Sequence, residues 1–333
     1  DSRFMDDTVL CNILEAILSF QSRPNKDPKN DPDEKIKSGE EDKDSVQRVS
    51  NYQQYPLSPA SEAFAEILIC EIALKNRDRL GMLWHNHLSR HYCNRLDTLS
   101  MNVAESQSEL IFKMSGSVEK SITGLLRISC FSMKRGKVAN DVLFTWSLLD
   151  SCLDEPKKLC ILDVLDRHFG EGIWRITRCI DDSCMLSEKG WHGILSLIRW
   201  CVHRGSSLPP ISSSQIGQPI GLADDDPSIQ AYRSLNYLLN VSEVKNKTPF
   251  AIGESINELV ITGDRRNCPK LSIAGLDLLQ VLTTLVGDAS IIHENESQLT
   301  KENRDLFWKK NWLPVIESVA NASRLSNNPV RFW

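Results

Sequence analysis

Length, composition and charge indicate a soluble, folded chain and exclude several other classes. The chain has 333 residues, of which 41% are hydrophobic and 25% charged, close to the average of soluble globular proteins. The formal net charge of −5, from 39 basic and 44 acidic residues, argues against a nucleic-acid-binding protein, because neutralising phosphates requires a basic surface. No stretch approaches 18 uninterrupted apolar residues, so we expect no membrane-spanning helix.

The start of the chain and its cysteines indicate a piece of a cytoplasmic protein. Residue 1 is Asp, and no basic segment followed by an apolar one resembles a secretory signal, so we expect a longer parent protein. The ten cysteines lie mostly within apolar helical patterns and form no CxxC pair. That distribution is typical of free thiols in a reducing compartment. The spacing of Cys179 and Cys184 matches no zinc ribbon, and we interpret both as ordinary residues at a helix end.

An amphipathic helix is predicted over residues 6–20, where apolar side chains recur every three or four positions. We expect this helix, within residues 1–20, to end a preceding repeat. Residues 21–50 contain few sizeable aliphatic side chains and mix 8 acidic with 7 basic residues. Such a segment cannot bury enough apolar surface to offset its conformational entropy. The sequence therefore predicts a disordered charged insert over residues 21–57.

Helical periodicity follows the insert. Ser58 or Ser61 is predicted to cap the first of these helices. Strand-like alternation is nearest at residues 257–262, a segment that also fits a helix. The predicted helices cover residues 61–74, 80–92, 118–133, 140–153, 156–169, 172–180, 187–203, 227–239, 255–261, 271–286 and 302–322.

The predicted fold class is all-α, with helical hairpins stacked as an armadillo- or HEAT-like solenoid. A helix arrives about every 20 residues, which favours a solenoid over a helix bundle, and this preference rests on spacing because no residue-level repeat is visible. A break rich in Ser, Pro and Gly over residues 205–226 is interpreted as a linker. It divides the array into a helical-repeat region, residues 58–204, and further helical repeats over residues 227–333.

No motif indicates catalysis or a cofactor. Phosphate-loop, dinucleotide-binding and serine-hydrolase motifs are absent from the sequence. The most enzyme-like feature is the cluster His85, His87, His91 and Cys93. On a helix, His87 and His91 would share one face, as zinc ligands do, but the glutamate of a zinc hydrolase is missing. We therefore favour a polar helix face over a metal enzyme. The acidic run at residues 224–226 is expected to be solvated.

Basic residues recur with a spacing of seven along one predicted helix. Lys120, Arg127 and Lys134 form a stripe beside its apolar face, because positions seven apart drift by only about 20° per step. Arg135 and Lys137 follow directly. These five residues, named here the basic row, are a candidate membrane- or partner-binding site, since anionic lipids attract such clusters. A solvated helix face is the alternative.

Trp308 and Trp312 form a second candidate contact. They lie at i and i+4 in the last predicted helix, as in helices that bind a membrane interface or a partner. Packing of this helix onto its neighbour is the more common reason for such a pair.

Two sequence blocks, residues 61–84 and 117–128, deserve comparison with known families. The first contains SEAFAEILICEIALKNRDR and ends at Leu83-Trp84, and the second reads SVEKSITGLLRI. In content, order and separation they resemble the start of the helical region that follows the catalytic domain in large ARF guanine-nucleotide exchange factors, closest to the Golgi-type GBF/GNOM branch. The positions that carry this resemblance are Asn76, Arg77, Asp78, Arg79, Trp84, Glu119, Gly124 and Arg127.

The residues of the first block can also be interpreted without reference to the family. Asn76 or Asp78 can cap a helix where one apolar segment stops and the next begins. Arg77 and Arg79 can pair with acidic residues of an adjacent hairpin. Both readings indicate that these residues build the architecture and do not perform catalysis.

The resemblance implies a regulatory, non-catalytic role. Members of the family exchange nucleotide with a domain that carries a glutamate finger, and no counterpart of its motif is found here, so the chain is expected to have no enzymatic activity and no cofactor. The parent protein would activate an ARF-family GTPase at Golgi or endosomal membranes in vesicle traffic. This region would bind an anionic membrane surface or other protein partners, with no nucleic acid involved. The alternative is a generic armadillo- or HEAT-like interaction scaffold unrelated to ARF.

Overall fold

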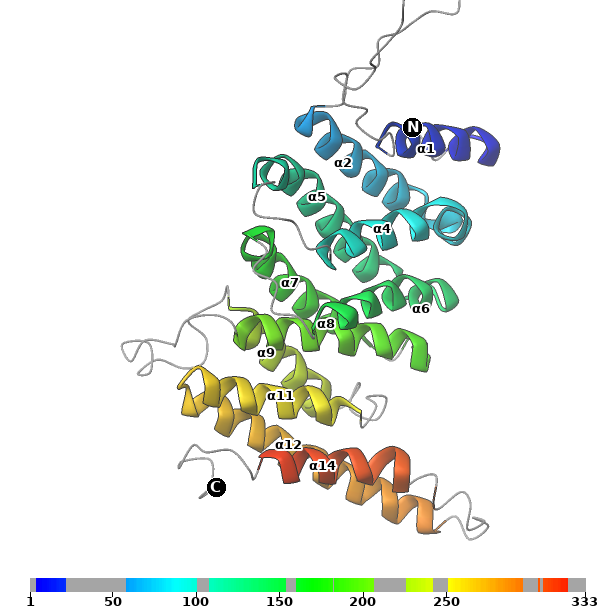
Figure 1. The fold of residues 1–333 in the computed structure, drawn as a ribbon. Coiled ribbons are helices and arrows are strands. Elements are labelled where there is room, and N and C mark those ends of the chain that lie inside the picture. Colours follow the sequence, from blue (N-terminus) through cyan, green and yellow to red (C-terminus); the bar gives the residue numbers. More distant parts are fainter. Residues whose placement is uncertain are drawn as a thin grey trace, which may run out of the picture.

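The protein is all-helical wherever its structure is described. The structure is a computed structural model that describes residues 4–21, 58–100, 108–153, 160–181, 183–206, 226–241, 251–295, 305 and 308–322. Every regular element within these ranges is a helix, and none is a strand (Figure 1). The all-α prediction is therefore confirmed. The predicted insert, apart from its first residue, and most of the predicted linker lie outside the described residues.

The helices follow the predicted order. The α-helices are α1 Asp7–Gln21, α2 Pro59–Lys75, α3 Leu80–Leu83, α4 Ser89–Ser100, α5 Ser108–Ser132, α6 Lys137–Phe144, α7 Cys160–Arg178, α8 Glu188–Ser206, α9 Pro227–Asn240, α11 Ile252–Arg265, α12 Pro269–Asn295 and α14 Leu313–Ala322. Shorter 3₁₀ turns form η2 (Arg77–Arg79) and η5 (Thr145–Cys152), and π-helical turns form η3 (Trp84–Leu88) and η7 (Trp308–Trp312). The strand-like segment 257–262 is part of α11.

Glycines inside helices made the predicted boundaries wrong in two places. Residues 156–169 and 172–180 were predicted as two helices, but α7 runs without a break through Gly170 and Gly172. A Cβ on Gly172 would lie 2.5 Å from a methyl carbon of Leu126, so this glycine allows α7 to approach α5. Similarly, α5 continues through Gly116 and begins ten residues before the predicted start at residue 118. None of these glycines ends a helix, and Gly170 and Gly172 lie where α7 packs closely against its neighbours.

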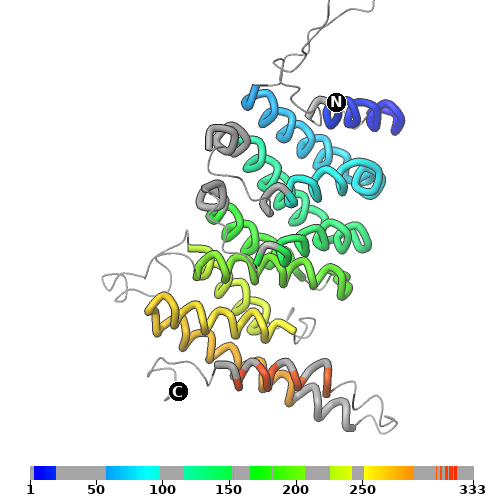
Figure 2. The backbone as a smooth tube through the Cα atoms, in the orientation of Figure 1, coloured from blue at the N-terminus to red at the C-terminus, as the bar shows by residue number. Residues whose placement is uncertain are grey.

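The helices stack in chain order into an elongated array, with α1 at one end and α14 at the other (Figures 1 and 2). Each long helix packs against the one that follows it in the same row. One row consists of α2, α5, α7, α9 and α12, and the other of α4, η5 with α6, α8, α11 and α14. Contacts between the rows join α5 to α6, α7 to α8, and α11 to α12. Among the described helices, the main contacts are therefore those between neighbours in the array.

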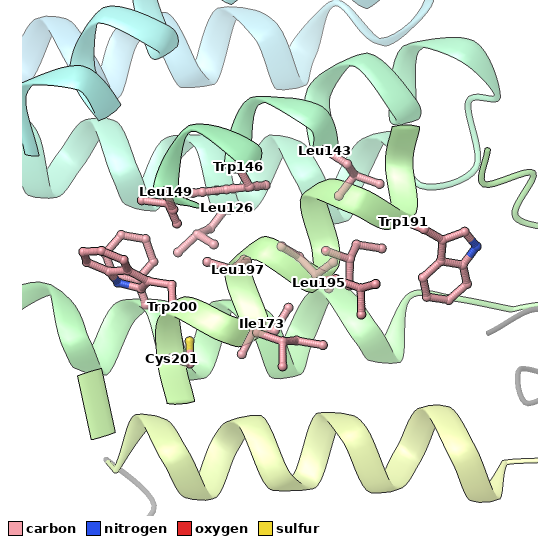
Figure 3. Packing of buried hydrophobic residues seen from close by; sticks show 14 of the residues in the cluster. Leu126, Leu143, Trp146, Leu149, Ile173, Trp191, Leu195, Leu197, Trp200 and Cys201 are labelled. Carbon is pink, nitrogen blue, oxygen red and sulfur yellow. The ribbon is translucent and has the colours of Figure 1, made fainter. Parts of the chain in front are cut away.

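A continuous apolar core runs between the two rows. The buried cluster begins at Leu10 in α1 and ends at Val315 in α14. At its centre the ring of Phe169 meets Trp146 and Trp200, with centroids 6.0 and 5.9 Å away, and Trp146 Nε1 donates to Ser129 Oγ at 3.0 Å. Figure 3 shows side chains from α5, η5, α7 and α8 gathered in this layer. Burying each large apolar side chain contributes about 1.5–3 kcal/mol, which makes this core the main source of stability.

Buried ion pairs join neighbouring helices along the array. Arg204 of α8 donates two hydrogen bonds to the Asp166 carboxylate of α7, at 2.9 and 3.0 Å. Arg266, just after α11, donates to Asp226 at 2.6 Å, and Asp226 in turn caps the N-terminus of α9 by accepting from Ser228 N. The expectation that the acidic run at 224–226 is solvated is therefore wrong for Asp226, which is 8% exposed.

One helix is long and apolar enough to cross a membrane by length and composition. This is the part of α12 from Pro269 to Gly287, whose mean hydropathy is 1.3. Half of it is buried within the molecule, where α12 packs against α11 and α9. These contacts are those of a core helix at the edge of a stack.

Candidate partner-binding surface

The two sequence blocks fold against each other as α2 and α5. A Cβ on Gly124 would lie 3.2 Å from Cβ of Cys70 and 3.3 Å from the hydroxyl oxygen of Tyr92, so the absent side chain lets α5 approach both α2 and α4. Cys70 Sγ lies 3.7 Å from the carbonyl oxygen of Gly124. Arg127 Nη2 donates to Glu71 Oε1 at 2.9 Å. The blocks thus form one structural unit although an unrelated segment separates them in sequence.

The Asn76–Arg79 segment fixes the corner after α2. Asn76 is 3% exposed and its side-chain amide donates to the carbonyl oxygen of Ile72 at 2.7 Å, which satisfies the end of the helix. Arg79 Nη1 donates to the carbonyl oxygen of Met5 at 2.6 Å and to Asp7 at 3.0 Å, while its Nη2 donates to Asn76 Oδ1. Arg79 therefore ties α1 to the rest of the array, in agreement with the predicted pairing to an acidic residue of another hairpin.

The other motif residues also hold the helices together. Trp84 is 1% exposed and stacks on Tyr92, with ring centroids 6.0 Å apart. Glu119 Oε1 lies 3.1 Å from His168 Nε2, which links α5 to α7. The architectural interpretation is supported by the contact of Glu119 with a neighbouring helix and by the burial of Trp84 in the core.

Most of the basic row is paired with carboxylates that sequence spacing does not reveal. Its ion pairs are Lys120 with Glu119 at 3.4 Å, Arg127 with Glu71 at 2.9 Å, Lys134 with Asp181 at 3.0 Å and Arg135 with Asp78 at 3.6 Å. Lys120 and Arg127 project along the body of α5, whereas Lys134, Arg135 and Lys137 lie at the turn into α6. The row is therefore not one uniform cationic stripe.

Several cations lie close together at the turn between α5 and α6. Arg77 and Arg135 both stack on the ring of Phe131, at 5.0 and 5.5 Å from its centroid. Arg135 Nη1 also donates to the carbonyl oxygen of Arg77 at 2.7 Å. These contacts bring the corner after α2 beside the turn after α5. We name the cations Arg77, Lys134, Arg135 and Lys137 the cationic corner.

The cationic corner borders an open cavity of about 540 Å³. Arg77, Lys134 and Arg135 line it together with apolar residues of α3 and α6. Two carboxylates described beside the four cations are Asp78, 99% exposed, and Asp181. Hydrogen bonds from the Ser183 hydroxyl and Lys134 hold the pKa of Asp181 well below its usual range, and the pKa of Lys134 is raised by Asp181. Both groups stay charged near neutral pH, and the corner keeps an excess of positive charge.

The histidine cluster is divided between two neighbours. His85 Nε2 lies 3.5 Å from Asp141 of α6, whereas His91 Nε2 lies 2.9 Å from Glu66 of α2. The π-helical turn η3 changes the register between them. In the part of the chain that the structure describes, no three His, Cys, Asp or Glu side chains are placed to hold a metal ion. His85 is 53% exposed, as expected for a polar helix face, whereas the His91 side chain is 10% exposed and lies beside the buried Glu66 between α2 and α4.

The two tryptophans near the C-terminus stack on each other. The rings of Trp308 and Trp312 lie 6.1 Å apart between centroids at an angle of 27°. Trp312 packs against the apolar core, and Trp308 is 51% exposed. One member therefore anchors the helix, as expected for packing, and the other remains available for contact.

Sequence reasoning missed Phe131 and the role of Arg77 in the cationic corner. Phe131 follows the second block, and no spacing rule connects it with Arg77 across the chain. Comparison with known proteins adds no assignment: the chain matches no protein-family model, no curated protein and no solved structure.

Proposed function

We propose that the chain is a non-catalytic, armadillo- or HEAT-like repeat region of a large guanine-nucleotide exchange factor for ARF-family GTPases. In this role it regulates Golgi or endosomal vesicle traffic from the cytoplasmic side, and ARF is contacted through the parent protein. The observation that carries the proposal is the packing of the two family-like blocks as α2 and α5. Gly124, Arg127 and Arg79 each make an inter-helix contact that explains their place in the motif.

The order of helix contacts supports a solenoid. Each row advances by one helix per hairpin, and α5, α7 and α9 contact successive neighbours in chain order. Such arrays present long surfaces to partners, because every repeat contributes its own exposed face. A repeat region of this kind has no need of a catalytic site to regulate an attached domain.

The cationic corner is the proposed contact with an anionic membrane or an acidic partner. Its excess positive charge would attract anionic lipid headgroups, and added salt would weaken that attraction. Lys120 and Arg127 contribute less, since they lie on α5 outside the lining of the cavity that the cationic corner borders.

Vesicle binding tests the corner directly. The full chain is mixed with phosphatidylcholine vesicles that contain or lack phosphatidylserine, and bound protein is measured after sedimentation at low and high salt. We expect binding only to the anionic vesicles, reduced several-fold by Lys134→Glu combined with Lys137→Glu. The matched control is Lys120→Glu combined with Lys309→Glu, which changes charge equally away from the corner. Equal binding by the two double variants would rule out the corner as the contact.

The assignment to an exchange factor has its own test. Sequencing the parent transcript upstream of the codon for Asp1 should reveal an in-frame exchange domain with a glutamate finger. The isolated chain should leave the rate of nucleotide release from ARF unchanged. A start codon directly ahead of Asp1 would contradict the proposal.

A protein-interaction scaffold unrelated to ARF is the second candidate. It is favoured by exposed apolar side chains on the first two helices, among them Val9 at 48%, Phe64 at 65% and Ile67 at 41%. Such residues on a helix surface are typical of protein contacts. Absence of an exchange domain upstream would shift the assignment to this scaffold.

A further inference from the structure

Ser58 lies directly before α2, at the end of the array that carries α1 (Figure 1). Its backbone is extended, with φ −65° and ψ 150°, and Pro59 follows it as the first residue of the helix. A serine followed by proline is the dipeptide that proline-directed protein kinases recognise, and they bind it in an extended conformation. The sequence contains two Ser/Thr-Pro dipeptides, Ser58-Pro59 and Thr248-Pro249, and the second lies outside the described residues.

The hydroxyl group of Ser58 is accessible from solvent. Ser58 and the three residues after it are all exposed. Serines inside the helices differ in this respect: Ser129, Ser132 and Ser234 are buried, and their hydroxyl groups donate to carbonyl oxygens three or four residues earlier. Ser58 therefore combines the recognised dipeptide with an accessible nucleophile.

The first turn of α2 can open without disturbing the rest of the array. Two hydrogen bonds to Ser58 close this turn, from Ser61 N to Ser58 Oγ at 3.2 Å and from Glu62 N to the Ser58 carbonyl oxygen at 3.1 Å. Pro59 has no N–H, so it has no backbone hydrogen bond to lose when it leaves the helix. Helix ends open locally at a small fraction of the free energy of unfolding. A kinase can therefore bind Ser58 and Pro59 in an extended form while the core stays folded.

We propose that Ser58 is a phosphorylation site of a proline-directed protein kinase, and that the phosphate strengthens the N-terminal cap of α2. The Ser58 hydroxyl oxygen attacks the γ-phosphorus of MgATP, the bond from that phosphorus to the β–γ bridging oxygen breaks, and ADP leaves. The hydroxyl proton passes to the catalytic aspartate of the kinase. One phosphoryl group is transferred, and neither an oxidant nor a reductant is needed.

The first turn of α2 offers hydrogen-bond donors to a phosphate on Ser58. The N–H groups at the start of a helix carry partial positive charge and attract anions. Ser61 N donates to Ser58 Oγ, and the Ser61 hydroxyl lies 2.9 Å from the same oxygen, so both are placed to donate to phosphate oxygens. Glu62 in the same turn is acidic and opposes the phosphate in part. Hydrogen bonds to an ionised acceptor are about twice as strong as neutral ones, so we expect a stronger cap despite Glu62.

Ser58 is distant from the cationic corner. Arg77 of the corner follows the opposite end of α2, and the 17 residues of this helix span about 25 Å at 1.5 Å per residue. Salt at physiological concentration screens charges beyond about 8 Å. Phosphorylation of Ser58 should therefore leave vesicle binding by the cationic corner unchanged, so the tests of the two sites are independent.

Mapping of the transferred phosphate tests this proposal. The full chain is incubated with MgATP and a mitogen-activated protein kinase that is active on a standard substrate, and the product is mapped by tandem mass spectrometry. We expect phosphate on Ser58, and its loss in Pro59→Ala, which keeps the hydroxyl group but removes the recognised proline. The matched control Ser61→Ala keeps the dipeptide and should be phosphorylated on Ser58 to the same extent as the unchanged chain.

Hydrogen exchange measures the effect on the helix. In the phosphorylated chain, the amides of Ser61 and Glu62 should exchange several-fold more slowly than in the unmodified chain, while exchange in α12 stays the same. Absence of phosphate on Ser58, phosphate on Thr248 alone, or faster exchange in the first turn of α2 would overturn the proposal.

Discussion

Glu66 is a buried charged residue that joins two helices. Its carboxylate has no exposed surface, and its oxygens lie 2.9 Å from His91 Nε2 and 2.7 Å from Arg95 Nη2. Burial by itself would raise the pKa of Glu66, but the hydrogen bonds and positive charge of His91 and Arg95 outweigh burial, so the pKa is lowered from 4.5. The contacts of Glu66 with His91 and Arg95 join α2 to α4.

These contacts predict a specific dependence of stability on pH. Because the folded-state pKa of Glu66 lies below the unfolded value of 4.5, its contribution is fully present above pH 4.5 and is lost as the pH falls through the folded value. Glu66→Gln should lower the free energy of unfolding by about 3 kcal/mol at neutral pH, because His91 and Arg95 would stay partly buried without a counter-charge. The variant should also reduce the loss of stability at acidic pH. Urea denaturation between pH 3 and about 7 measures both effects. The exposed Glu258→Gln should change neither; an unaltered loss of stability at acidic pH in Glu66→Gln would contradict the assignment.

The positively charged residues show why the site was harder to predict than the helices. Spacing predicted Lys120, Arg127 and Lys134 on one side of a helix, but α5 ends at Ser132, so Lys134 lies in the turn that follows. Spacing also did not reveal that Glu71 and Asp181 on other segments neutralise two of them. Ion pairs between helices depend on packing that periodicity along one helix does not contain.

Helix ends depended on the same kind of tertiary information. Helix existence followed from apolar periodicity, whereas glycine positions were misread as ends because glycine has a low helix propensity. In α7 the cost of Gly172 is offset by close contact with Leu126 of α5. At Gly172, packing between elements therefore compensates for the low helix propensity of glycine.

Two glycines give opposite predictions at the scale of helix pairs. A Cβ on Gly193 of α8 would lie closer than van der Waals contact to the Leu143 carbonyl of α6, which is backbone and cannot rotate away. Gly193→Ala should therefore destabilise the protein by about 1–3 kcal/mol. Gly116, within α5, has nothing within 4 Å of such a Cβ, so Gly116→Ala should stabilise by about 0.5–1 kcal/mol. Denaturant midpoints of the two variants test this, and a shift in the same direction for both would contradict the close approach of α8 to α6.

At the scale of the whole molecule, contacts between neighbours make stability local. α2 and α5 lie near one end and α11 and α12 near the other, and among the described residues the main contacts between them run through the intermediate helices (Figure 1). In arrays of this kind the free energy is approximately a sum over repeats and their interfaces. A perturbation at one end should therefore lower protection there and leave the far end unchanged.

Two arginines in different parts of the array allow this locality to be measured. Arg79→Ala removes the contacts of α1 with the corner after α2, and Arg266→Ala removes the pair with Asp226 near α9. In native-state hydrogen exchange, the first variant should increase exchange in α1 and α2, and the second in α9 and α11. The losses in the double variant should add to within about 0.5 kcal/mol, because the sites share no partner. If either variant instead increased exchange along the entire array, the helices would form one cooperative unit. A change at the cationic corner would then affect every helix and not only its neighbours.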